Sequence, residues 1–190
     1  QVLPDGVAGR SWSAEPVSAG VPFRVDDGIT SPSQLGMTGT RAAQFRVTQR
    51  DPQSGKITWV LATFLADGGP YRLVAGSGAF GGTDLARETT DAIVVTTGTA
   101  TFEILKHKFN VLDRVVLGST ELVARHGGGG IVATAAGVRY ESGLDAASEV
   151  VLEENGPVMA TVRARGTLRS ASGGSGFDYT ARLHFYRGVG

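Results

Sequence analysis

The chain has 190 residues, with 18 acidic and 18 basic side chains and no cysteine. Zero net charge argues against a nucleic-acid binder, because such a protein needs a surplus of cations to displace counterions from phosphates. The lack of cysteine excludes disulfides, thiolate nucleophiles and thiolate metal sites, and the 41% apolar fraction is that of a folded globular protein.

Strand patterns follow one another along the chain. Residues 41–50 place Phe45 and Val47 two positions apart with polar neighbours between them. Residues 56–66 are rich in β-branched and aromatic side chains, and Trp59 is expected in the core because it lies inside this apolar run. Further strands are expected in residues 92–116, 131–136, 148–155, 159–170 and 177–188.

The last two of these segments alternate most clearly. In residues 177–186 an apolar or aromatic side chain stands at every second position, and residues 159–165 alternate in the same way. This pattern is typical of antiparallel sheets with one solvated face. Turn-forming residues at 51–55, 154–157 and 170–176 predict hairpin loops between strands.

Helical periodicity is weak throughout the sequence. Residues 84–92 are the best candidate, for one or two turns only. About a dozen short strands with turns between them predict an all-β protein, either a barrel, a sandwich or one of each. The glycine-rich residues 76–82 and the polar stretch after them predict two domains, residues 1–83 and 84–190.

Several phrases together resemble the N-terminal β region of the exo-rhamnogalacturonan-lyase-like (PcRGLX/YetA-like) proteins. The matching phrases are SAGVPF at 18–23, AAQFRV with its Gln44, the Ser54-Gly55 turn, ITWVLATF at 57–64, TGTATFEILKHKFNVLDRVVL at 97–117, EENGPVMATVRARG at 153–166 and FDYTARLHFYRG at 177–188. The resemblance implies a small RIFT-type β-barrel in residues 1–83, followed by an antiparallel β-sandwich-like region in residues 84–190. In that family a catalytic α/α-toroid follows these regions. We expect these 190 residues to lack it, and to be either the front portion of a longer secreted protein or a relative that has dispensed with the catalytic part.

No catalytic constellation can be assembled from the residues. The three histidines, His107, His126 and His184, fall in three different elements, which argues against a shared metal ion. Glu153 and Glu154 are adjacent, so a strand would point them to opposite faces. The sequence has no Gly-x-Ser-x-Gly elbow.

Two weaker possibilities concern bound ions. HGGGGI at 126–131 lacks the residues of a phosphate loop and is interpreted as a wide turn, with a backbone anion site as the sharper alternative. No cofactor and no metal site are predicted, although calcium held by scattered loop oxygens is left open.

Carbohydrate contact is the binding function to which the exposed aromatic candidates point. Sugar rings stack on aromatic faces while their hydroxyl groups need polar partners. The candidates with an aromatic ring or an adjacent arginine are Trp12, Tyr71, Arg72, Tyr140, Tyr186 and Arg187.

The preferred hypothesis is a non-catalytic β module of a secreted polysaccharide-degrading protein, with a polysaccharide or a C-terminal catalytic domain as its partner. The alternative is a structural subunit of an extracellular or viral assembly that associates through edge strands. The chain begins at Gln1, so we expect that a signal peptide has been removed, and the excess of arginine over lysine suggests a bacterial source. No apolar run is long enough to span a membrane.

Overall fold

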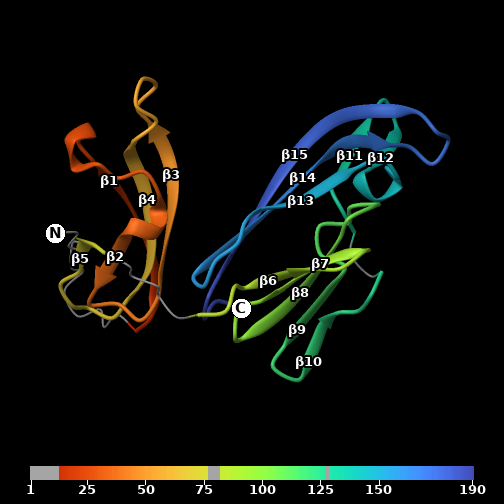
Figure 1. Ribbon diagram of the computed structural model, residues 1–190. Coiled ribbons are helices and arrows are strands. Elements are labelled where there is room, and N and C mark those ends of the chain that lie inside the picture. Colours follow the sequence, from red (N-terminus) through yellow and green to blue (C-terminus); the bar gives the residue numbers. More distant parts are fainter. Residues whose placement is uncertain (1–12, 77–81, 127–128) are drawn as a thin grey trace. The chain divides into compact units, whose positions relative to one another are not determined.

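The computed structural model describes residues 13–76, 82–126 and 129–190 (Figure 1). Their regular structure is almost entirely β-strand, and the helical elements are three 3-10 turns of three residues each. The predicted all-β class is confirmed. The chain divides into two compact units, Gln1–Thr83 and Asp84–Gly190.

In the described residues of the first unit, the strands form two antiparallel sheets. One has the order β1-β4-β3, and the other pairs β2 with β5. The strands are β1 (Glu15–Pro22), β2 (Leu35–Thr38), β3 (Ala43–Arg50), β4 (Ile57–Ala66) and β5 (Arg72–Ala75), with 3-10 turns η1 (Val25–Asp27) and η2 (Pro32–Gln34). The hairpin predicted at 51–55 joins β3 to β4. Because the described strands pair as two separate sheets, the RIFT-type barrel stays a prediction.

In strand β4, the alternation of side chains decides which residues are buried in the core of the first unit. Val60, Ala62 and Phe64 point to one side, where they are at most 1% exposed. Trp59 lies out of step with them and is 42% exposed, so the expectation that it is a core residue is wrong. Its indole lies against Gly20 of β1, where a Cβ would come within 2.9 Å of the indole nitrogen. The alternation of side chains along the strand therefore decides that Trp59 is exposed, although its sequence neighbours are apolar.

The second unit has two antiparallel sheets on a common core. One sheet has the order β10-β9-β8-β7-β6, and the other has the order β11-β12-β14-β13, with β15 paired to β14. The strands are β6 (Ala86–Glu88), β7 (Ala92–Thr96), β8 (Ala100–Leu105), β9 (Arg114–Leu117), β10 (Thr120–Val123), β11 (Val132–Ala135), β12 (Val138–Glu141), β13 (Glu149–Glu154), β14 (Met159–Arg169) and β15 (Ser175–Tyr186), and η3 is Ser142–Leu144. Figure 1 shows the two sheets as separate layers.

Side chains from both layers form the core of the second unit. Ile93, Val95 and Ile104 come from the first layer, and Val162 and Phe185 come from the second. Burial of these apolar surfaces is what holds two such sheets face to face. The arrangement is that of a β-sandwich, as predicted.

Two features of this sandwich differ from simple expectation. The stretch 84–92 contains strand β6 and no helical turn, so that prediction is wrong. The segment is a strand because it pairs with β7, and the side chain of Asn155 supports it further. That side chain accepts the N–H of Ala86 at 3.0 Å and donates to the carbonyl of Ala86 at 2.9 Å, as a neighbouring strand would. In addition, β12 and β13 share one edge of β14, and β15 covers the other.

Candidate functional site

The aromatic candidates of the first unit are Trp12, Tyr71 and Arg72. Trp12 lies outside the described residues. Tyr71 is 4% exposed, its ring lies 4.8 Å from that of Phe64, and its hydroxyl accepts the backbone N–H of Asp67 at 2.5 Å. The tyrosine therefore holds the turn before β5 in place. Arg72 is the exposed member of the pair.

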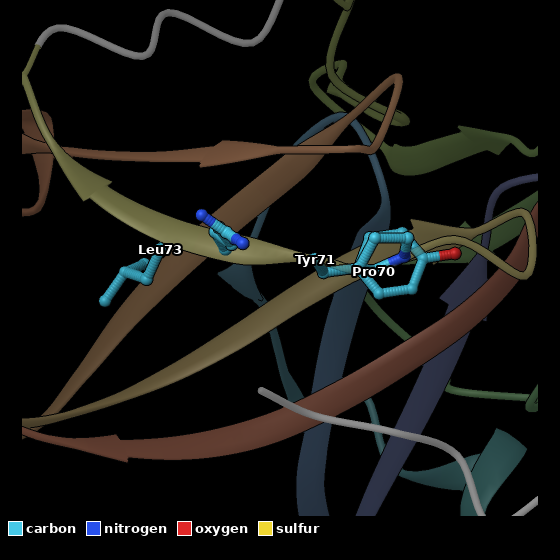
Figure 2. A pocket seen from close by; sticks show the side chains of 4 residues that line it. Pro70, Tyr71 and Leu73 are labelled. Carbon is cyan, nitrogen blue, oxygen red and sulfur yellow. The ribbon is translucent and has the colours of Figure 1, made fainter.

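A hollow of about 330 Å³ adjoins these two residues, and its described lining is Pro70, Tyr71, Arg72 and Leu73. Figure 2 shows the labelled side chains spaced along the single segment that enters β5. Because this lining is one short segment with one charged side chain, the hollow offers few converging polar groups for a ligand.

Tyr140 lies on β12 in the second unit, beside the beginning of β15. Its ring occupies the space over Gly176, where a Cβ would come within 2.7 Å of it. Phe177 meets the ring edge-on with centroids 6.4 Å apart and is itself 55% exposed. Tyr140 and Phe177 thus form a partly open aromatic pair, of which Phe177 was not among the predicted candidates.

Tyr186 and Arg187 lie at the other end of β15. Tyr186 lines a hollow of about 220 Å³ together with Phe102, His184 and others. Arg187 donates from its side chain to the carbonyl of Pro157 and from its backbone to that of Val158. Ten residues of strand separate Gly176 from Tyr186, which corresponds to about 33 Å. The predicted candidates of the second unit are therefore not brought together.

The outer face of the β13-β14-β15 sheet carries an ordered array of charges. We call Arg163, Arg165, Arg169 and Arg182 the arginine strip. The first three lie on β14, with Arg163 and Arg165 two positions apart and Arg169 four positions further on, and Arg182 is the register partner of Arg163 on β15. Their side chains are 27–59% exposed. The alternation of 159–165 predicted this face, but its acidic partners come from another strand.

Two glutamates of β13 hold most of this strip. Glu153 accepts two hydrogen bonds from Arg182, at 2.6 and 3.0 Å, and these raise the pKa of that guanidinium. Glu149 contacts Arg165. Arg163 lies between the two glutamates at 3.6 and 4.0 Å, and its Nε makes no hydrogen bond within the described residues. Among the arginines of the strip, Arg163 is therefore the one whose N–H groups are least satisfied by neighbouring residues.

A shallow hollow of about 390 Å³ opens on the same face, next to the strip. It is lined by Ala147, Glu149, Arg165, Gly166, Thr167, Asp178, Tyr179 and Thr180. The side chains of Thr167 and Asp178 meet there through a 2.6 Å hydrogen bond. One guanidinium donor, hydroxyl groups and carboxylate acceptors thus converge on one hollow, which is the pattern that hydroxyl-rich ligands require.

The ring of Tyr179 points to the sandwich core behind this hollow and stacks on Phe109 at 6.0 Å. Burial, and then the charge of Asp145, raise the pKa of the Tyr179 hydroxyl, with Ser148 opposing. The unfolded chain therefore releases this proton at lower pH than the folded chain does. The stability contribution is complete below about pH 10 and is lost as pH rises through the folded value.

We expect the substitution Tyr179→Phe to flatten the alkaline loss of stability. Phenylalanine keeps the ring and removes the ionisable hydroxyl, which makes no hydrogen bond within the described residues. Urea unfolding followed by circular dichroism at neutral pH and above about pH 10 measures the effect. An alkaline loss equal in both proteins would contradict it.

His184 and His126 have separate partners in the structure. His184 shares a 3.1 Å contact with Thr161, and His126 lies 3.2 Å from the buried carboxylate of Asp113. Within residues 13–76, 82–126 and 129–190, no group of three histidine, aspartate or glutamate side chains could hold a metal ion. Residues 127 and 128 of the predicted glycine turn lie outside the described residues.

Comparison with known proteins gives little guidance. No protein-family model matches the chain, and no curated protein matches it. Among solved structures, an alpha-mannosidase from Enterococcus faecalis V583 aligns over 94% of this chain and 27% of its own length, with a TM-score of 0.43 and 13% identity. The chain thus covers much less than two thirds of that protein. A likeness of this size establishes neither a family nor a substrate.

In the described part of the chain, no helix has the length and apolar character needed to cross a bilayer.

Proposed function

We propose that this chain is a non-catalytic β module of a secreted polysaccharide-degrading protein, similar to the rhamnogalacturonan lyases, and that it binds glycan. The observation that supports this best is the arginine strip with its adjoining hollow of about 390 Å³. The resemblance of the strand and turn phrases adds the polysaccharide class. Pectic glycans fit both the strip and the resemblance, because they are polysaccharides that carry carboxylates as well as hydroxyl groups.

The chemistry of the strip favours such a ligand. The carboxylates of Glu149 and Asp178 accept hydrogen bonds from sugar hydroxyl groups, and guanidinium groups bind carboxylates in a two-point fork. Arg163, held at 3.6 and 4.0 Å by two glutamates, is free to tighten on a ligand carboxylate without losing a short hydrogen bond. The strip follows β14, so an extended sugar chain can lie along it.

We expect the double substitution Arg165→Ala and Arg182→Ala to weaken binding to polygalacturonate or rhamnogalacturonan at least about tenfold, since charged hydrogen bonds contribute about 1.5–3 kcal/mol each. Native gels cast with and without the polysaccharide measure this as a change in retardation. Arg41→Ala is the matched control, because Arg41 is also exposed and paired with an aspartate but lies in the first unit.

Three results would contradict the proposal. The first is equal mobility of the wild-type chain with and without polymer, and the second is equal retardation of the double variant. The third, release of unsaturated uronate by the chain alone, would contradict the non-catalytic part.

A second candidate is a structural subunit that self-associates. It is favoured by β15, a strand of twelve residues that pairs only with β14 among the described elements. Such an edge can add a strand from another molecule. A mass that rises with concentration in light scattering would support this candidate over the glycan module.

A further inference from the structure

A carboxylate is completely buried in the loop between β8 and β9. The Asp113 side chain is 0% exposed. One of its oxygens, Oδ1, accepts the amide of Asn110 at 2.9 Å and the backbone N–H of His126 at 3.0 Å, and the His126 ring nitrogen lies 3.2 Å from it. The polar neighbours of this carboxylate are therefore gathered on one oxygen.

The other oxygen has no hydrogen-bond partner. Asp113 Oδ2 is buried and unpartnered within the described residues, and so is the amide oxygen of Asn110, a residue that is only 9% exposed. These two acceptors belong to side chains joined by a single 2.9 Å hydrogen bond. Buried acceptors without a donor are rare in folded proteins, since each costs about as much as a lost hydrogen bond.

The charge of this carboxylate is also poorly balanced by the protein. His126 is its only ion-pair partner within the described residues, and the His126 side chain is 77% exposed. The nearby arginines are engaged elsewhere, Arg114 with Glu121 at 2.5 Å and Arg125 with Glu103 at 2.7 Å. A buried carboxylate normally needs a close cation or several hydrogen bonds.

The backbone fixes these groups where they lie. Leu112 donates to the carbonyl of Asn110 across Val111, which has a φ of 70°. This is the rare form of the γ-turn, and a β-branched residue adopts it only when its surroundings enforce it. Gly130 also donates to the Asn110 carbonyl, and the Ser142 hydroxyl donates to the preceding carbonyl, that of Phe109. The oxygens of Asp113 and Asn110 are thus held on a rigid frame.

We propose that Asp113 and Asn110 are ligands of a calcium ion. Calcium binds oxygen atoms alone, takes carboxylate and amide oxygens readily, and fills the rest of its shell with backbone carbonyls and water. Asp113 Oδ2 and Asn110 Oδ1 supply one anionic and one neutral ligand. The ion supplies the charge that the protein lacks at this point. The site is independent of the arginine strip, which lies on the outer face of the other sheet.

The test is calcium titration of the full chain after chelator treatment, followed by calorimetry and by thermal unfolding. We expect a saturable heat of binding and a rise in Tm of about 5 °C or more at a hundredfold excess over Kd. Asp113→Asn should abolish both effects. Asp91→Asn, which changes an exposed acid of the second unit outside both sites, should leave both unchanged.

If Asp113→Asn does not fold, the variant Asn110→Asp provides a second test. It places a second carboxylate next to the first, so Tm should fall in chelator and the calcium-dependent rise should exceed that of the wild type. The proposal is overturned if the wild type shows no calcium heat and no Tm rise, which would indicate a buried water instead. It is overturned equally if zinc binds through His126 and calcium does not, or if the Asn110→Asp chain folds and ignores calcium.

Discussion

Replacing Phe109 by alanine is expected to lower the free energy of unfolding of the second unit by about 3–5 kcal/mol. The Phe109 ring is 0% exposed, belongs to the core between the two sheets and stacks on Tyr179. Its removal leaves a cavity that strands on both sides cannot close without breaking their pairing. Since small domains are stable by only about 5–15 kcal/mol, the loss is a large fraction of the total.

Urea unfolding followed by far-UV circular dichroism measures this loss as a lower midpoint at unchanged slope. Phe177→Ala is the matched control, because the same side chain is removed from a position that is 55% exposed. Its effect should stay within about 0.5 kcal/mol. Equal midpoints for the two variants would show that Phe109 does not support the core.

The second large effect is expected at Gly166, in the middle of β14. Glycine normally weakens a strand, so a larger residue here would ordinarily stabilise the protein by about 0.5–1 kcal/mol. At this position a Cβ would come within 2.6 Å of Asp145 Oδ2 and 3.0 Å of the Tyr179 hydroxyl. Asp145 cannot retreat easily, because Oδ2 accepts the backbone N–H of Thr167 at 2.9 Å. We therefore expect Gly166→Val to cost about 1–3 kcal/mol through overpacking.

Gly143→Ala provides the comparison, since a Cβ there meets nothing within 4 Å and the backbone has no positive φ. The same urea titration should show little change for Gly143→Ala and a clearly lower midpoint for Gly166→Val. A Gly166→Val midpoint at or above that of the wild type would mean that Asp145 moves aside without loss.

The strands were predictable where one face of the sheet is apolar. Tyr179, Ala181, Leu183 and Phe185 alternate in the sequence, and all four pack on the core of the second unit. The β6 segment was mistaken for a helical turn because it is only three residues long, which is too short to show alternation. The Asn155 side chain, which supports it in addition to its strand partner β7, lies 69 residues away, and a contact across that distance leaves no mark in a local pattern.

The site was predictable only in part, for a similar reason. The alternation in β14 indicates that Arg163 and Arg165 share a face, but the register with β13 decides that Glu149 lies beside both. Asp113 looks like an ordinary loop residue in the sequence. Its burial depends on how the loop of 106–113 packs under residues 129–131 and η3, which a linear reading does not reveal.

The open position of Trp59 gives the molecule a built-in optical probe. Both tryptophans of the chain, Trp12 and Trp59, precede Thr83, so fluorescence excited selectively at tryptophan reports on the first unit, whereas tyrosines lie in both units. Emission from Trp59 should be red-shifted and quenched by iodide even in the native protein. Tryptophan emission does not report on the second unit. A single titration that records both this emission and far-UV circular dichroism can therefore separate the unfolding of the two units.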